Sequence, residues 1–255
     1  MPFTLAHPAA VIPFRKARFM ALLPLIIGSM TPDVIGFLPY ALERHLPNSH
    51  SPIGTVLVDL PIGYLALLIV MLFRAALVRP LWEPHRSLIA NNLNVYFVRP
   101  RCWLIALPSL LVGSWTHIVW DRFTHDTHWT YRNLPLLYQP LFPDAPHQLP
   151  IFHALQYITS AAGLIYIGFS YWQALQQTRA SSIKPPAPAL RQKQLLGALA
   201  AISLALGAAR LLSIDFTYES VYMYLSLILK TAIIAFALLY FIYGLILSTT
   251  ASGQS

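Results

Sequence analysis

The sequence predicts an all-α, polytopic membrane protein, a bundle of about five full spans preceded by a short N-terminal helical hairpin. Hydrophobic residues make up 56% of the 255 residues and charged residues only 10%, whereas a soluble domain carries about 25% charged residues. Several apolar runs approach the roughly 20 residues that cross a bilayer as a helix. These two observations indicate an integral, multi-pass membrane protein.

The distribution of charge argues against a nucleic-acid partner. The net charge is +8, but the basic residues form short clusters between the apolar runs, as the positive-inside rule expects. The basic loops 79–101 and 174–194 are therefore placed inside. Loops 122–150 and 214–220, and the loop around His50, then lie outside.

The first 33 residues predict the hairpin. Residues 7–17 and 20–31 are apolar but too short to span, and Thr31-Pro32-Asp33 ends the second run. Two short helices would bring His7 and Asp33 to the same end, whereas a single signal-anchor helix would put them on opposite sides. The basic residues Arg15, Lys16 and Arg18 favour an inside position for part of this hairpin.

The remaining elements follow from where the apolar runs start and stop. Ser51 followed by Pro52 is typical of an N-cap and a first helical residue, which places His50 at the mouth of the first span. Spans are expected at residues 53–78, 102–120, 151–173, 195–213 and 221–247. The Gln-rich and then Pro-rich segment 176–194 predicts a flexible linker. It separates a site-bearing domain, 1–175, from two plainer spans in 195–255.

A polar row follows the second expected span. His117, Asp121 and His125 are spaced i, i+4, so on a helix their side chains project from one face. A row of imidazole, carboxylate and imidazole can hold a divalent metal; the alternative is a histidine-rich helix end at the membrane interface. Under the predicted topology, His50 and His153 lie at the same membrane face as this row.

Two charged residues, Asp59 and Lys230, lie inside expected spans. A charge at such depth is costly and is usually paired or functional. We expect the two side chains to face each other or a polar cavity; a proton or ion path is the functional alternative.

Several motifs carry a resemblance to a known family. They are Met1-Pro-Phe-Thr-Leu-Ala-His7-Pro8-Ala9-Ala10, Gly28-Ser29-Met30-Thr31-Pro32-Asp33, His50-Ser51, and Gly113-x-x-x-His117-x-x-x-Asp121-x-Phe123-Thr124-His125. Residues 1 to about 175 thereby resemble an uncharacterised bacterial membrane-protein family, a domain of unknown function. That family is distantly similar to the LexA-regulated inner-membrane metal-dependent hydrolases and, more remotely, to the zinc-dependent phospholipase C fold.

The resemblance implies a set of metal ligands. Asp33, His50, His117 and Asp121 would complete one site, and His7 with a shared Asp121 would contribute to a second. Further nitrogen ligands would come from His125 or His128 and from His153. His125 and Asp126 are alternatively expected to orient the ligands through hydrogen bonds. The third metal of the soluble fold needs a His-x-x-x-Glu pair, but residue 157 is Tyr, which puts that metal in doubt.

The sequence therefore predicts a membrane-embedded metal-dependent hydrolase acting on a phosphoester or a membrane lipid or lipid-linked substrate. Zinc is the expected metal and would lower the pKa of a bound water to about 7; manganese and iron stay open. Asp33 or Asp121 would serve as ligand or general base. The alternative is a non-catalytic membrane protein, a transporter component or scaffold, with a structural or vestigial metal site.

Overall fold

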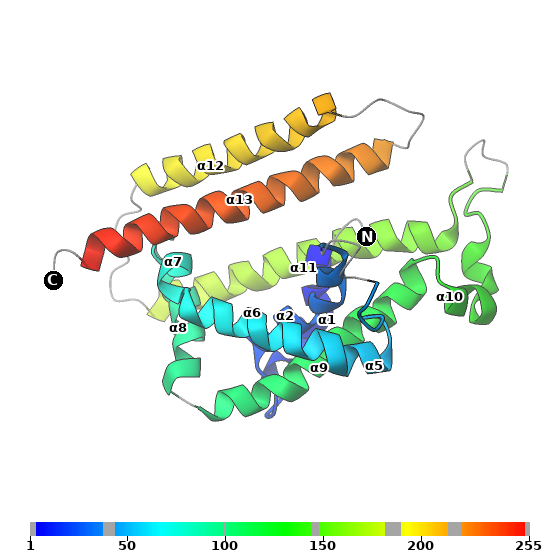
Figure 1. Ribbon diagram of the computed structural model, residues 1–255, viewed down its shortest axis with the longest axis horizontal. Helices are drawn as coiled ribbons and strands as arrows, with labels where there is room; N and C mark the ends of the chain where they lie inside the picture. Colours follow the sequence, from blue (N-terminus) through cyan, green and yellow to red (C-terminus); the bar gives the residue numbers. More distant parts are fainter. Residues whose placement is uncertain are drawn as a thin grey trace. The chain divides into compact units, whose positions relative to one another are not determined.

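The structure is a computed structural model that describes residues 4–37, 44–98, 100–143, 148–181, 190–213 and 221–252. These residues are almost entirely helical, and the only β-bridge among them joins Pro140 and Pro150. The all-α prediction is confirmed (Figure 1). Five helices are long and apolar enough to cross a membrane: Pro52–Leu72, Arg101–Thr124, Ile151–Arg179, Leu190–Leu212 and Leu227–Thr249. The chain is an integral, multi-pass membrane protein.

Contacts divide the chain into two compact units. The first contains Phe3–Ile69 and Val95–Gln173, and the second contains Val70–Asn94 and Ala174–Ser255. The predicted division at residues 175 and 195 stays a prediction. All the residues of the candidate site described below belong to the first unit.

Short helical segments open the first unit, and three long ones complete it. The opening segments are η1 (Thr4–Ala6), α1 (Pro8–Val11), η2 (Ile12–Lys16), α2 (Leu22–Gly28), α3 (Thr31–Val34) and η3 (Ile35–Phe37). The next span combines α5 (Pro52–Gly54), the π-helical turn η4 (Thr55–Asp59) and α6 (Leu60–Leu72). Then come α9 (Arg101–Thr124), α10 (His128–Asn133), η5 (Pro135–Tyr138) and α11 (Ile151–Ser181).

The predicted start of the first span is confirmed. Ser51 is the N-cap residue of α5, and its hydroxyl accepts a hydrogen bond of 3.0 Å from the backbone N–H of Gly54. Pro52 occupies the first helical position, where its missing N–H costs nothing. The span ends earlier than predicted, because the backbone leaves the helical conformation at Phe73 and α7 (Arg74–Val78) begins after it.

Close packing against α9 holds the N-terminal hairpin. A Cβ atom added to Gly113 would lie 2.5 Å from the carbonyl oxygen of Leu25, and one added to Gly28 would clash with the backbone of Leu110. At the other end of α2, the Ser109 hydroxyl accepts a hydrogen bond of 3.0 Å from the Ala21 N–H. Because both contacts advance in the same chain direction, α2 runs parallel to the middle of α9.

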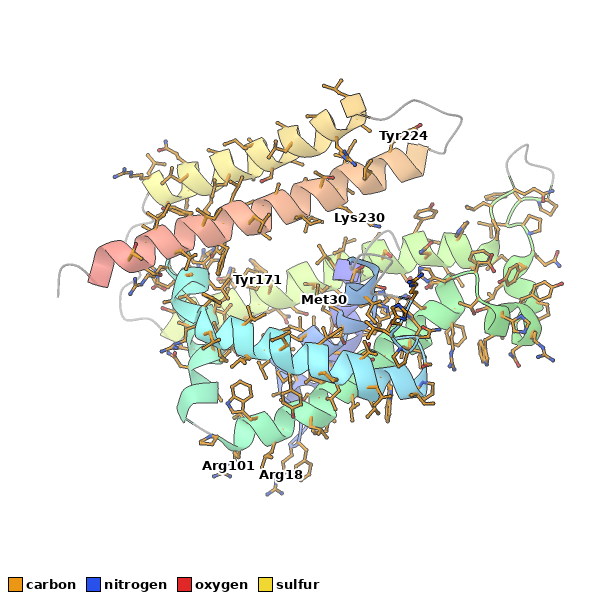
Figure 2. The ribbon with its side chains drawn as sticks, viewed as in Figure 1. Arg18, Met30, Arg101, Tyr171, Tyr224 and Lys230 are labelled. Atoms are coloured by element: carbon orange, nitrogen blue, oxygen red, sulfur yellow. The ribbon has the colours of Figure 1, made fainter. Side chains whose placement is uncertain are left out.

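The direction of α2 explains how one hairpin can carry basic residues expected on the inner side of the membrane and candidate ligands expected on the outer side. Arg18 lies at the end of the first unit that holds Arg101, the first residue of α9 (Figure 2). His117 and Asp121 lie near the other end of α9, about 1.5 Å per residue along its axis. The hairpin therefore runs along α9, with its basic tip and its two candidate ligands at opposite ends.

The second unit holds α7, α12 (Leu190–Ala209), η6 (Arg210–Ser213) and α13 (Val221–Ser252). Helices α12 and α13 lie side by side (Figure 1). The Tyr240 hydroxyl donates a hydrogen bond of 2.6 Å to the Leu77 carbonyl, and the Arg79 guanidinium donates one of 2.7 Å to the Ser248 carbonyl. Segment 70–94 thus packs on the C-terminal spans.

Two expected loops contain helices. Segment 79–101 was expected to be a basic loop, but it holds the whole of α8 (His85–Val98), and segment 122–150 holds α10 and η5. Polar helices of this kind lack the apolar periodicity by which the sequence shows a buried helix. Residues 182–189 of the predicted linker and the whole predicted loop 214–220 lie outside the described residues.

Candidate metal centre

Helix α9 supplies the most buried part of the candidate site. His117 is fully buried and Asp121 is 6% exposed, and their i, i+4 spacing places both on one face of the helix. The predicted helical row is one residue too long, because α9 ends at Thr124 and His125 adopts an extended backbone. His125 nevertheless reaches back to Asp121, with 3.3 Å between Nδ1 and Oδ1.

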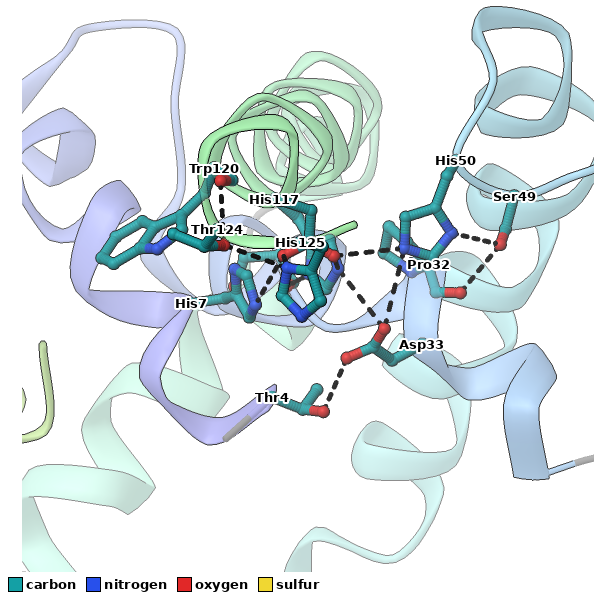
Figure 3. A network of polar contacts seen from close by, with 12 residues as sticks. Thr4, His7, Pro32, Asp33, Ser49, His50, His117, Trp120, Thr124 and His125 are labelled. Carbon is teal, nitrogen blue, oxygen red and sulfur yellow. Dashed lines mark hydrogen bonds and ion pairs between the residues drawn. The ribbon is translucent and has the colours of Figure 1, made fainter. Parts of the chain in front are cut away.

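The other candidate ligands come from the hairpin and from the loop before the first span. His7 is 4% exposed and precedes α1, Asp33 lies in α3, and His50 precedes α5. Figure 3 shows these residues meeting around His117. The hairpin prediction is thereby confirmed in the respect that matters here, since His7 and Asp33 lie at the same end.

Four candidate ligand atoms converge. The Nε2 atom of His117 lies 3.3 Å from Asp121 Oδ2 and 3.4 Å from Asp33 Oδ1. The Nε2 atom of His50 lies 3.4 Å and 3.8 Å from the same two oxygens. All four atoms lie within 4.8 Å of one another. Metal–ligand distances of about 2.0–2.1 Å in a tetrahedral site put neighbouring ligand atoms about 3.3–3.4 Å apart. Three of the four separations therefore match such a site.

The orientation of His117 leaves a buried nitrogen facing two carboxylates. Its Nδ1 atom lies 2.8 Å from the Ser29 carbonyl oxygen, which accepts hydrogen bonds only, so Nδ1 carries the proton. In a neutral ring Nε2 then presents a lone pair to Asp33 and Asp121. This Nε2 has no hydrogen-bond partner among the described residues. A cation among these atoms would satisfy all three groups, and a backbone carbonyl behind a histidine ligand is a common feature of metal sites.

Asp33 is held in its ionised form. Burial by itself would raise the pKa of Asp33, but the neighbouring His117 and the hydrogen bond from the Thr4 hydroxyl outweigh it and hold the pKa below its usual value. The Thr4 hydroxyl donates a hydrogen bond of 2.6 Å to Asp33 Oδ2, leaving Oδ1 to face the cluster. Within the described part of the chain, the ion-pair partners of Asp33 and Asp121 are all histidines. Two poorly compensated carboxylates therefore attract a cation.

The second oxygen of Asp121 faces a second group. Its Oδ1 atom lies 3.5 Å from His7 Nε2 and 3.3 Å from His125 Nδ1. The His7 ring stacks on His117 with 3.8 Å between centroids. Burial, reinforced by nearby His117, lowers the pKa of His7 to about 3, so its ring is neutral and can donate a lone pair. The geometry thus brings His7 to a shared Asp121, as the resemblance implies.

Among the further candidates, His125 lies beside the cluster, whereas Asp126 and His153 do not. His125 Nε2 lies 2.7 Å from the side-chain amide of Gln156 on α11 and its Nδ1 lies 3.0 Å from the Thr124 hydroxyl, so hydrogen bonds occupy both ring nitrogens. Asp126 accepts a hydrogen bond of 2.5 Å from Tyr138. His153 is exposed and packs against Phe152. The structure therefore does not place Asp126 or His153 among the converging atoms.

The two intramembrane charges, Asp59 and Lys230, lie in different units. Asp59 is 1% exposed and accepts a hydrogen bond of 2.5 Å from the Ser114 hydroxyl on α9. Lys230 is an exposed residue of α13 (Figure 2). The pairing of Asp59 with Lys230 stays a prediction.

Several partners of the cluster escaped the sequence reasoning. They are Thr4, Ser29 through its carbonyl, Trp120, Gln156 and, for Asp59, Ser114. Thr4 and Ser29 lie inside the quoted motifs, which was the available signal. A carbonyl acceptor and a lone glutamine on an apolar helix carry no signal of their own.

Fold and site together define a multi-pass helical membrane protein with four residues, Asp33, His50, His117 and Asp121, arranged as a group that could hold a metal. A family described as a domain of unknown function, DUF4184, matches residues 1–251, and the chain belongs to it. The match extends beyond residue 175, so the two C-terminal spans are part of the family. No curated protein and no solved structure matches the chain. The distant resemblance to hydrolases therefore stays an interpretation.

Proposed function

We propose that the protein is a metal-dependent hydrolase of the bacterial inner membrane, acting on a phosphoester. The observation that supports it is the convergence of two imidazole nitrogens and two carboxylate oxygens, partly buried and at separations suited to one cation. A divalent cation held there, with zinc favoured by the mixed nitrogen and oxygen donors, would polarise a phosphoryl oxygen and supply a water-derived nucleophile at neutral pH.

The residues of the chain have distinct roles in this proposal. Ser29 and Thr4 orient His117 and Asp33 from behind, so that their free atoms face inward. Asp121 joins the two groups through its two oxygens. The side chain of His50 is 37% exposed, so it lies on the open side of the cluster, where a substrate would enter. Asp33, ionised and partly exposed, is the better placed of the two carboxylates to accept a proton from an attacking water.

Two basic residues indicate how the first unit is oriented across the membrane. Arg18 and Arg101 share the end of the first unit away from the cluster (Figure 2). By the positive-inside rule that end is cytoplasmic, which would place the cluster at the outer face.

The alternative is a non-catalytic membrane protein that keeps a metal for structure. The exposed positions of His153 and Tyr157 favour it, since the ligands of a third metal are not assembled. Hydrolysis of p-nitrophenyl phosphate and bis(p-nitrophenyl) phosphate by the detergent-purified chain separates the two. We expect metal-dependent turnover that His50→Asn abolishes and His153→Ala retains. Metal binding without turnover of either ester, with unfolding at lower temperature after chelation, would support the structural alternative instead.

A further inference from the structure

An apolar groove lies beside the metal centre in the first unit. Its walls include Phe14 from the hairpin, Trp115, Val119 and Trp120 from α9, and Leu155 and Thr159 from α11. The groove has a volume of about 730 Å³, within the roughly 300–1,000 Å³ of small-molecule sites. Helices α9 and α11 are both candidate membrane spans, and the groove residues Trp115 and Val119 are each 53% exposed, so a bilayer around these helices would face the groove.

The groove and the metal centre share a wall. The Trp120 ring meets the edge of His7 with 5.7 Å between centroids. Its indole N–H donates a hydrogen bond of 3.1 Å to the Thr159 hydroxyl, which fixes the ring between the two sites. The Thr124 hydroxyl, also in this wall, lies 3.0 Å from His125 Nδ1. Trp120 and Thr124 therefore line the groove and also contact histidines of the cluster.

A polar pocket adjoins the cluster elsewhere. Arg44, Asn48 and Ser49 line it together with the candidate ligands Asp33 and His50, and its volume is about 430 Å³. In Figure 3, Ser49 and His50 lie on one side of His117 and Trp120 lies on the other. The guanidinium of Arg44 suits a phosphate, which it can bind through two parallel hydrogen bonds.

We propose that this site binds a phospholipid of the surrounding bilayer, with one acyl chain in the apolar groove and the phosphate in the polar pocket. The proposal rests on the proposed function, since it places the phosphate at the metal centre. The order of apolar groove, histidine–carboxylate cluster and arginine-bearing pocket matches the order of chain, ester and charged headgroup in such a lipid. A soluble phosphoester would leave the groove without an occupant.

Lipid retention measured by native mass spectrometry tests the proposal on the full-length, metal-loaded chain released from detergent. The probe is a dioleoyl phosphonate lipid, in which a P–C bond replaces the cleavable ester. Dioleoylglycerol provides the chains without the phosphate, and glycerol 3-phosphate provides the phosphate without the chains. We expect the phosphonate lipid to bind best and glycerol 3-phosphate at least tenfold more weakly.

Two pairs of variants probe the groove. Leu155→Trp fills it, whereas Ile158→Trp adds the same bulk at a position on α11 that is 63% exposed and outside the groove. Val119→Trp and Leu104→Trp make the same comparison on α9. The groove variants should weaken retention of both dioleoyl lipids about tenfold, the loss of roughly two buried methylene groups, and their controls should bind as the wild type does. Equal lipid binding by a groove variant and its control overturns the proposal. A protein dimer that dissociates in the groove variants but not in their controls also overturns it, because a second copy of the protein would then occupy the groove.

The headgroup and the chemistry are tested separately. Arg44→Gln should weaken the phosphonate lipid and leave dioleoylglycerol unchanged, while Arg18→Gln, at the other end of the unit, should change neither. Equal effects of the two arginine variants contradict the phosphate position. Turnover of soluble phosphoesters without groove-dependent lipid retention overturns only the lipid proposal. If a protein that binds no metal retains dioleoylglycerol in a groove-dependent way, both the proposed hydrolase function and the phosphate position are overturned. The acyl-chain site in the groove would still stand.

Discussion

The Nδ1 atom of His117 lies 2.8 Å from the backbone carbonyl oxygen of Ser29. This contact joins the helix that carries two candidate ligands to the hairpin that carries two others, and it fixes which nitrogen of His117 is free. We predict that His117 carries its proton on Nδ1. Nitrogen-15 NMR of histidine-labelled, metal-loaded protein, with His117→Gln to assign the signal, measures this directly. A proton on Nε2 would show that His117 does not act as an inward-facing donor.

The close approach of α2 and α9 should be as important for metal binding as the ligands are. Gly113→Ala places a methyl group 2.5 Å from the Leu25 carbonyl and 2.7 Å from the Ser29 N–H. Overpacking of this kind costs about 1–3 kcal/mol, and it would displace Ser29 from His117. We expect a lower unfolding temperature and a lower metal content. Gly168→Ala is the matched control, because a Cβ there meets nothing within 4 Å and alanine favours the helix by up to about 1 kcal/mol. Similar losses in both variants would contradict this account of the glycine.

Thr4 should act through Asp33. Thr4→Val removes the hydroxyl that donates the 2.6 Å hydrogen bond to Asp33 Oδ2 but keeps the side-chain shape. Loss of such an orienting hydrogen bond typically lowers metal affinity about 10–100-fold. Thr4→Ser, which keeps the hydroxyl, should restore most of the affinity. Competition with a chromophoric zinc chelator provides the measurement, and equal affinities of the valine and serine variants would exclude the role.

The buried His7 should make stability depend on pH in a defined window. Burial lowers the pKa of His7 to about 3 from 6.5, so between these values the unfolded chain binds a proton that the folded chain does not. Stability therefore rises with pH through this window, and the contribution of His7 is lost as the pH falls from about 6.5 toward 3. Thermal unfolding of chelator-treated protein should show a weaker pH dependence in this range for His7→Asn. An unchanged pH dependence in the variant would mean that His7 is not neutral and buried.

The sequence was informative where local chemistry determines the outcome. Apolar run lengths indicated the spans, and Ser51-Pro52 indicated a helix start because capping is a local property. The spacing of His117 and Asp121 placed them on one face. Neither spacing nor composition could show that α2 runs parallel to α9, because that depends on Gly28 and Gly113 removing side chains at one contact. The direction of α2 is what lets Arg18 and Asp33 lie at opposite ends.

Contacts between distant segments explain the other differences. His125 appeared to continue the helical row, yet α9 ends at Thr124 and the ring reaches Asp121 from an extended backbone. His153 has the residue type of a ligand, but the face of α11 on which it lies is exposed. Gln156, three residues later, meets His125 instead. Such facts depend on helix rotation in the packed bundle, which a pattern of single residues does not specify.

Metal analysis of the full-length protein tests the central claim most directly. The chain would be purified in detergent, loaded with zinc, desalted and measured by inductively coupled plasma mass spectrometry as wild type, Asp121→Asn, His50→Asn and His153→Ala. We predict at least one tightly held zinc per chain in the wild type and in His153→Ala, and much less in Asp121→Asn and His50→Asn. Wild-type protein that is folded but retains no more metal than Asp121→Asn would contradict the account.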